Sequence, residues 1–499
     1  MLAAAALLLA ISIAVVVATR GDAAPEDTTA RLVPPEALLY AHLSTSEGRT
    51  QDARLLTLAG RFTALRERVP ALGMALTPAA GGLDFERDVR PWLGEDAAIA
   101  LLDGGSAGPA PLLIAAVDDR AGAGRALAKL GARPAGSHAG TELLSLPPRA
   151  TAAFAGDHLV IGPAAAVRGA IDRAGEDGPP SLADGRVYHR AAEGREGAAS
   201  LELFATTNGL RRLSDGATGV AGTAGRLLLS PRLEGIHAQV AAEEAGARIS
   251  ARVLRTPGAA PAAFEPTLAD RVPRDAAGFL ALPGVDAMTG IAERAGAAAL
   301  LALVADLLPS AAGVELADVL APLGDEAQLT VQAGDAAPIF TLGARTRDAA
   351  STRESLARLQ GPVSDRLGGG PFQQRELRGT DTFTLRATPE LEPSYALTKS
   401  AVVLSTAASG LEQLRPARSP ATGASVLEDL LPEEGEKVEA LGFLDPRQLL
   451  ALGERTGLPA LSSPAARDDL GRFRAAGLVV KEDANQPTDT TAELFLQIP

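Results

Sequence analysis

The stretch Asp88–Ala97, which reads DVRPWLGEDA, is followed 230 residues later by Asp318–Ala327, which reads DVLAPLGDEA. Both stretches keep a Pro, a Leu-Gly pair and two acidic residues in one order, and an apolar run follows each of them. Similarity at a long separation is typical of a repeated structural unit, so the two stretches indicate that the body of this 499-residue chain occurs twice. In each copy we expect the Leu-Gly turn to end a helical segment and begin a strand.

Further matches flank these stretches in the same order. Val33–Leu43 is similar to Val272–Leu282, and Pro111–Val117 is similar to Pro338–Gly343. The first pair begins 239 residues apart and the second pair 227 residues apart. Loop insertions into one copy of a duplicated unit would produce such a drift while keeping the order of the elements.

The two copies also continue and end alike. Asp157–Gly162 is similar to Lys399–Ser405, each a predicted strand leading into a helix, and each copy closes with a predicted hairpin, Gly235–Val253 or Gly477–Ile498. Short turns rich in Gly, Pro and Asp join neighbouring strands, which must then be antiparallel. The sequence therefore predicts an α+β fold of two duplicated units, each an antiparallel sheet with helices packed on it. A doubly wound parallel fold fits less well.

The composition of the chain suggests where these units begin and end. We expect residues 32–255 to form repeat unit 1 and residues 267–499 to form repeat unit 2, with the Pro- and Ala-rich Thr256–Pro266 (TPGAAPAAFEP) as a linker. Leu55–Val69 has apolar residues at helical spacing. The corresponding Ile291–Leu308 is far more apolar, which favours a helix buried on all sides and leaves open one wall of an apolar groove.

Residues 1–20 predict an N-terminal transmembrane anchor. Leu2–Ala18 is uncharged and apolar at all but one position, and at 1.5 Å per residue it spans about 26 Å. A signal peptide cleaved after Val16–Ala18 stays open as an alternative. Residues 21–31 predict a flexible stalk. We therefore expect a single-pass protein of the cell membrane with an extracytoplasmic body, although Arg20 alone would favour the opposite orientation.

Composition excludes several classes of function. The net charge is −14 and the pI about 5.0, whereas a nucleic-acid-binding protein needs a cationic surface to displace counterions, so we expect no nucleic-acid partner. The chain has no cysteine, which excludes disulfides, thiolate zinc ligands and cysteine nucleophiles. Hydrophobic residues make up 46% of the chain, enough to build folded cores rather than a disordered protein.

No motif in the chain meets the requirements of a catalytic or cofactor site. Gly104–Gly108 (GGSAG) has the spacing of a nucleophile elbow around Ser106, but Pro109 and a predicted strand follow where a helix is required, which favours a hairpin loop. Gly122–Gly124 (GAG) resembles the start of a dinucleotide-binding loop, but Leu127 stands where a small residue is required, which favours a simple helix start. We predict no catalytic residue and no cofactor.

The histidines form no local metal-binding pair, because none lies three or four residues from another. We predict no metal site from this spacing, and only a site assembled by the fold itself stays open. The five are His42, His138, His158, His189 and His237.

Three other features are interpreted as structural. Trp92, the single tryptophan, is expected to fill a core. Tyr188-His189 predicts a contact at an edge of the fold. The acidic pairs Asp118-Asp119 and Glu243-Glu244 are expected to be solvated at strand ends rather than to bind calcium.

Val33–Ala37 (VPPEA), Asp84–Gly94 (DFERDVRPWLG) and the N-terminal apolar segment together resemble a bacterial membrane-anchored family, the one built on domain of unknown function 3352. The resemblance covers about Leu32 to the C-terminus, and Asp84–Gly94 is its most specific part. It implies an extracytoplasmic body on a single anchor, with no assigned activity and no catalytic residues to carry over. The second copy lacks the tryptophan of this segment, which argues against a role that needs both copies equally.

We therefore expect a non-enzymatic, membrane-anchored protein of the cell envelope that acts by binding or scaffolding. Its expected partner is the membrane, through the N-terminal helix, and a protein partner or an apolar ligand stays open. The alternative is a carrier or sensor of an apolar ligand held in a cleft between or within the repeats. A third hypothesis is an unrecognised hydrolase, which a polar cleft with converging carboxylates would favour.

Overall fold

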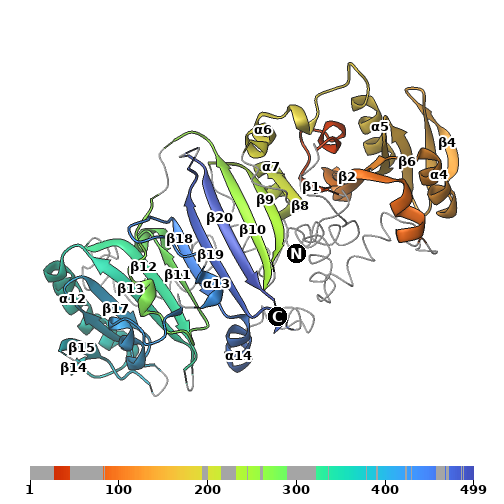
Figure 1. The fold of residues 1–499 in the computed structure, drawn as a ribbon. Helices are drawn as coiled ribbons and strands as arrows, with labels where there is room; N and C mark the ends of the chain where they lie inside the picture. Colours follow the sequence, from red (N-terminus) through yellow and green to blue (C-terminus); the bar gives the residue numbers. More distant parts are fainter. Residues whose placement is uncertain are drawn as a thin grey trace. The chain divides into compact units, whose positions relative to one another are not determined.

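The structure is a computed structural model. It describes residues 27–44, 83, 85–193, 201–214, 232–243, 245–258, 262–288, 322–334, 337–377, 379–388, 391–421, 424–428, 430–456, 467, 471–484, 486 and 488–498. The chain forms two compact units: unit 1 is Met1–Gly258 with Thr488–Thr490, and unit 2 is Ala259–Pro487 with Thr491–Pro499. Each unit contains an antiparallel sheet with helices (Figure 1), so the predicted α+β class is confirmed.

Unit 1 contains a sheet whose described strands pair in the order β4-β5-β6-β7-β3-β2-β1-β8-β9-β10, each pair antiparallel. The strands are β1 Leu39–Ser44, β2 Leu93–Asp103, β3 Pro109–Val117, β4 Arg133–His138, β5 Thr141–Leu146, β6 Ala150–Ala155, β7 His158–Gly162, β8 Leu201–Thr206, β9 Leu233–Glu243 and β10 Gly246–Arg255. The helices are η1 Thr29–Leu32, η2 Phe85–Val89, η3 Arg90–Trp92, η4 Gly105–Ala107, α4 Arg120–Lys129, α5 Ala164–Arg173, η5 Leu182–Asp184, α6 Arg186–Ala192 and α7 Thr207–Ser214.

Unit 2 contains a sheet whose described strands pair in the order β14-β15-β16-β17-β13-β12-β11-β18-β19-β20. The strands are β11 Gly278–Leu282, β12 Leu323–Gln332, β13 Ile339–Thr346, β14 Gln373–Leu377, β15 Thr380–Thr384, β16 Ser394–Leu397, β17 Ala401–Ser405, β18 Ala440–Leu444, β19 Ala475–Glu482 and β20 Thr490–Gln497. The helices are η6 Ala269–Arg271, α12 Ala349–Leu367, η8 Ala408–Leu414, α13 Ser425–Glu428 and α14 Pro446–Thr456.

The two strand orders correspond position by position along the chain. The central strands β3-β2-β1-β8 of unit 1 have the same neighbours as β13-β12-β11-β18 of unit 2. The strand order within each unit ends in the predicted hairpin, β9–β10 in unit 1 and β19–β20 in unit 2. A strand leads into a helix at β7–α5, as the sequence predicts, and into the 3-10 helix η8 after β17.

A β-bulge interrupts the second strand of each unit at the Leu-Gly turn. In unit 1 the register between β2 and β3 shifts between Leu93 and Ala97, and in unit 2 the register between β12 and β13 shifts between Leu323 and Ala327. A Cβ atom on Gly94 would lie 3.0 Å from the Cβ of Ala116, so a larger residue here would push the two strands apart at the bulge. Bulges redirect side chains, and both of these carry a buried carboxylate.

The cores of unit 1 lie on both faces of its sheet. One buried cluster includes Tyr40, Ile114 and Phe204, and a second contains Trp92 with Leu127 of α4. Trp92 is 7% exposed, and its indole Nε1 donates a hydrogen bond of 2.7 Å to the carbonyl of Asp88. The prediction that the single tryptophan fills a core is therefore confirmed.

The N-terminal part of the sequence prediction needs one correction. The predicted anchor, residues 1–20, lies outside the described residues, and no helix in the described part of the chain is long and apolar enough to cross a bilayer. The predicted flexible stalk, residues 21–31, is wrong at its C-terminal end. Thr29 is fully buried and begins η1, because its hydroxyl and the neighbouring amides find partners inside unit 1.

The predicted linker 256–266 needs a similar correction. The boundary between the units falls inside it, at Gly258–Ala259. Its end is nonetheless part of unit 2, because Phe264 is 1% exposed and exchanges two backbone hydrogen bonds with Val438. The predicted helices Leu55–Val69 and Ile291–Leu308 lie outside the described residues, and with them the expected wall of an apolar groove.

Candidate functional site

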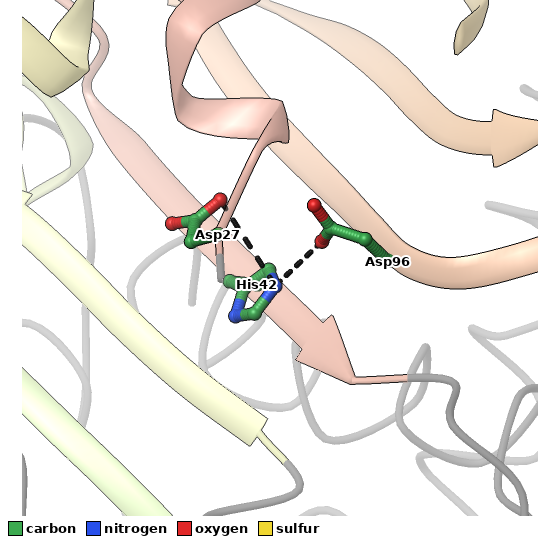
Figure 2. A group of neighbouring side chains, drawn as sticks. All are labelled: Asp27, His42 and Asp96. Carbon is green, nitrogen blue, oxygen red and sulfur yellow. Dashed lines mark hydrogen bonds and ion pairs between the residues drawn. The ribbon is translucent and has the colours of Figure 1, made fainter. Parts of the chain in front are cut away.

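Three titratable side chains from distant parts of the sequence meet inside unit 1. Asp27 precedes η1, His42 lies on β1, and Asp96 lies in the bulge of β2. His42 and Tyr40 are two residues apart on β1, so both side chains point to the same face of the sheet. The bulge turns Asp96 toward this face, and η1 brings Asp27 onto it (Figure 2).

The imidazole of His42 lies between the two carboxylates. Its Nε2 is 2.6 Å from Oδ1 of Asp96 and 4.0 Å from Oδ1 of Asp27 (Figure 2). The exposed fractions are 9% for Asp27, 4% for His42 and 4% for Asp96. Charges at this depth persist only when they are paired and hydrogen-bonded.

Hydroxyl and amide groups occupy the remaining positions around Asp27. Its Oδ1 accepts hydrogen bonds from the hydroxyls of Tyr40 at 2.5 Å and Thr29 at 3.1 Å and from the amide of Ala30 at 3.1 Å. The hydroxyl of Tyr188 donates to its Oδ2. Tyr188 is 6% exposed, so the expected edge contact at Tyr188-His189 is wrong: the ring packs edge-on against Tyr40 and reaches a buried carboxylate.

Asp96 fastens the incoming chain. Its Oδ2 accepts hydrogen bonds from the amide of Thr28 at 2.7 Å, from the hydroxyl of Thr28 at 2.6 Å and from the amide of Thr29 at 3.2 Å. The hydroxyl of Thr28 also lies 2.9 Å from Nε2 of His158. The carboxylate thus joins the first described residues of the chain to the sheet.

The electrostatics favour the charged forms of His42 and Asp27. Burial acts to lower the pKa of His42, but the charges of Asp27 and Asp96 and the hydrogen bond to Asp96 outweigh it and raise the pKa above 6.5. Burial acts to raise the pKa of Asp27, but His42 and the hydrogen bonds from Tyr188 and Tyr40 lower the pKa below 3.8. Burial and the nearby carboxylates raise the pKa of Tyr40 well above 10, so this hydroxyl keeps its proton and donates it.

A row of buried polar residues continues from His42 across the sheet. His42 is the cross-strand neighbour of Glu202 on β8, and His237 on β9 is the neighbour of Arg252 on β10. Nε2 of His237 is 3.5 Å from Oε2 of Glu202. Glu202, His237 and Arg252 are 6%, 4% and 8% exposed. We call His42, Glu202, His237 and Arg252 the polar row.

Two members of the polar row have apolar residues at the corresponding positions of unit 2. Ala281 pairs with Leu441 where His42 pairs with Glu202, and Leu441 pairs with Val479 where Glu202 pairs with Gln239. Replacing buried charges by apolar side chains is often neutral or stabilising. The sheet of unit 2 therefore forms without charges at these two positions.

The bulge carboxylate, in contrast, is present in both units. Glu326 is fully buried, and it accepts hydrogen bonds of 2.6 Å from the hydroxyl of Thr267 and 2.7 Å from the amide of Leu268. Thr28 and Thr29 make the same contacts with Asp96. Fastening the incoming chain is thus common to both units, whereas the His42–Asp27 pair is described in unit 1.

The arrangement of Asp27, His42 and Asp96 supports a structural role more than a metal site. These charged side chains pair with one another and hold the incoming chain, and we call them the ion-pair lock. The three candidate ligand atoms lie within 4.8 Å of one another, a spacing that a metal ion could accept. The Nε2 of His42 faces Asp96 at hydrogen-bond distance, however, and hydroxyl protons already fill both oxygens of Asp27. A metal ion would have to displace all of these protons.

Sequence reasoning singled out residues that the structure does not bring together. Ser106 lies in η4, the exposed turn of the β2–β3 hairpin, so the hairpin interpretation is confirmed. Gly122–Gly124 lies in the first turns of α4, as predicted. Glu243 is paired with Arg248 at 2.5 Å. Of the five histidines, His42, His158 and His237 approach the cluster from three strands, a convergence that spacing along the chain could not reveal.

The fold and this site define a class of protein: two α+β units, one with an ion-pair lock at its N-terminal end. The chain belongs to the family described as protein of unknown function (DUF3352), whose sequence profile matches residues 1–283. This confirms the family expected from the sequence, with the match lying over residues 1–283 rather than from Leu32 to the C-terminus.

Solved structures give only weak similarity. Crystal form I of TP0453 is 10% identical, with a TM-score of 0.29 over 46% of this chain and 79% of that chain. Crystal form III of TP0453 is 10% identical, with a TM-score of 0.28 over 46% of this chain and 80% of that chain. Likeness at this level carries no argument about this chain. No curated protein sequence matches it.

Proposed function

We propose that this protein is a membrane-tethered, non-catalytic binding protein of the cell envelope. Residues 1–20 would form the anchor, and the two α+β units would form an extracytoplasmic body that binds a partner through its surface. The apolar, uncharged run Leu2–Ala18 supports the anchor. The chain has a net charge of −14, so its body is suited to remain in solution beside the membrane rather than to lie on anionic lipid.

The observation that carries this proposal is the fastening of the chain where it enters unit 1. Thr28 and Thr29 lie a few residues after the expected anchor, and Asp96 holds both through three hydrogen bonds. Asp27 is held by hydroxyls from β1 and α6. A force on an anchor would therefore act on the interior of unit 1 rather than on a loose surface end. Such a lock suits a body that must stay attached.

The same cluster supports a role without catalysis. A general acid or base must reach a substrate, within hydrogen-bond distance or through one water molecule. His42 and Asp96 are each 4% exposed, and their side chains are hydrogen-bonded to each other. The hydroxyl of Thr28 also donates to Asp96. These groups are committed to holding the chain, and none is presented to an open cleft.

We also propose that the two units are two copies of one fold. The matching strand order and the matching bulges at Leu93–Ala97 and Leu323–Ala327 support this proposal. The shared fastening of Thr28 by Asp96 and of Thr267 by Glu326 supports it further. An experimental structure in which these bulges fell on strands with different neighbours would contradict it.

Topology and attachment can be tested together in cells. Protease added to intact spheroplasts should digest the body, and a variant lacking Met1–Arg20 should leave the membrane fraction and become soluble. The control is a cytoplasmic protein that the protease must not digest in the same sample. Full protection of the body, or a deletion variant that stays with the membrane after a salt wash, would refute the proposed tether.

A further inference from the structure

A cationic pocket lies on unit 2, between the segment that follows η6 and the segment at the end of η8. Its volume is about 700 Å³, within the range of small-molecule sites. Four arginines line it, against two acidic residues, Asp275 and Glu412. The chain as a whole carries a net charge of −14, so a local excess of cations stands out from the rest of the protein. The arginines are Arg271, Arg274, Arg415 and Arg418.

Hydrogen bonds between the two lining segments hold the pocket in shape. The amide of Arg274 donates to the carbonyl of Ser419 at 2.8 Å, and the amide of Ala417 donates to the carbonyl of Asp270 at 2.8 Å. Nη1 of Arg271 donates to the carbonyl of Leu414 at 2.9 Å. A site fixed before its ligand arrives loses less conformational freedom on binding.

Three of the arginines form no salt bridge in the described part of the chain. Arg274 and Arg418 are exposed, and neither side chain forms a salt bridge there. Arg271 is half-buried, and its guanidinium donates a hydrogen bond to a neutral carbonyl. The nearest described acidic influence on it is the charge of Glu326, which forms no salt bridge with it. Burial lowers the pKa of Arg271, which reflects the cost of holding this cation away from water. An anion in the pocket would offset that cost.

Unit 1 shows that the fold does not need these arginines. The amide of Leu182 donates to the carbonyl of Val33 at 2.7 Å, and the amide of Ala421 donates to the carbonyl of Val272 at 2.8 Å. Each pair of equivalent residues is 239 positions apart in the sequence (272 − 33 and 421 − 182). The same offset gives the residues of unit 1 that stand at the four arginine positions. They are Leu32, Pro35, Glu176 and Pro179.

We propose that this pocket of unit 2 binds a phosphate-bearing ligand. A guanidinium group presents a planar set of donors that matches the oxygens of a phosphate two at a time, and several guanidinium groups suit a dense, multivalent charge. Gln413 also lines the pocket and is buried. Its Nε2 donates a hydrogen bond of 2.8 Å to Oε1 of Gln332, which holds this side of the pocket in place. The phosphate could belong to a soluble ester or to a lipid headgroup. The site goes beyond the proposed tether and does not depend on it.

The test uses the full chain and two matched double variants. R274A/R418A removes two cations from the pocket, and R353A/R366A removes two exposed cations from α12 of the same unit. Pyrophosphate binding is measured by calorimetry, with citrate as a carboxylate of similar charge. Binding to phosphatidylcholine vesicles with and without phosphatidylglycerol is measured by flotation. Flotation is compared between the two vesicle compositions as well as between the variants, because an N-terminal anchor would bind both compositions alike. Thermal unfolding verifies that both variants fold.

The proposal expects pyrophosphate to bind the native chain and R353A/R366A alike, and to bind R274A/R418A at least about tenfold more weakly, because two charged contacts to the ligand are lost. Loss of flotation confined to R274A/R418A and to phosphatidylglycerol vesicles would instead identify a lipid headgroup as the source of the phosphate. Equal loss in both variants, no loss in either, or citrate binding as tightly as pyrophosphate would overturn the proposal. None of these measurements depends on where the body lies in the cell.

Discussion

Substituting His42 by alanine tests whether the buried cluster is a lock. The change removes the cation from between Asp27 and Asp96, which are 9% and 4% exposed, and leaves two buried carboxylates facing one another. Removing one partner of a buried ion pair costs about 3–5 kcal/mol. Asp96 keeps three other donors and Asp27 keeps its hydroxyl partners, so we expect the lower end, about 3 kcal/mol of the free energy of unfolding of unit 1.

The single tryptophan makes this measurement specific to unit 1. Trp92 is buried there, so its fluorescence during urea unfolding reports on unit 1. A loss of about 3 kcal/mol lowers the urea midpoint by roughly 1–3 M. The control is His138→Ala, because His138 is 2.7 Å from Asp172 in an exposed pair, where the loss should stay below about 1 kcal/mol.

A second substitution separates the charge from the packing. If uncompensated charge is the cause, Asp27→Asn should restore about 1 kcal/mol in the His42→Ala background, although it destabilises the native chain. Equal losses for His42→Ala and His138→Ala, or an Asp27→Asn penalty that is the same in both backgrounds, would refute the lock.

Three further predictions concern other parts of the structure. Folding raises the pKa of His42 above 6.5, so its contribution to the free energy of unfolding of unit 1 is fully present below pH 6.5 and is lost as pH rises through the folded pKa. Unfolding monitored by Trp92 fluorescence should show this loss of stability, and His42→Ala should abolish the pH dependence. Gly209→Ala should destabilise unit 1 by about 1–3 kcal/mol, since the new Cβ would meet the carbonyl of Leu38, whereas Gly124→Ala, with open space around it in α4, should stabilise it by about 0.5–1 kcal/mol in the same assay. Ser106→Ala should leave growth and envelope integrity unchanged, because this serine lies in an exposed hairpin turn; loss of function with unchanged folding would contradict that interpretation.

The fold could be predicted from the sequence where the signal is local. The Leu-Gly turn, the Gly- and Asp-rich turns and the alternation of apolar residues all act within a few residues, so the predicted strands and hairpins fall close to those observed. The end of the stalk was predicted wrongly because Asp27–Arg31 reads as polar and aperiodic. Its order comes from Asp96 and Tyr40, which no local pattern of these residues reveals.

The candidate site was not predicted, for a related reason. His42 and Asp96 are 54 residues apart, and Tyr188 is 161 residues from Asp27. One signal was present: His42 interrupts the apolar strand Leu39–Leu43 at a position that faces the core, and Ala281 stands at the same place in the similar stretch Val272–Leu282. A titratable residue at a core position of one stretch and an alanine in the similar stretch indicates a site specific to one unit.

The bulge in β2 also restricts how this part of the chain can change in length. Between Leu93 and Ala97 the strand has three residues where β3 has one between Val117 and Ala115, a surplus of two. Side chains alternate between the faces of a sheet, so an even surplus leaves the inward and outward positions on both sides of the bulge unchanged. Losing one residue would invert every side chain along the rest of β2. Insertions and deletions here can therefore be accepted only in pairs, and a deletion that takes Asp96 would release the end of the chain.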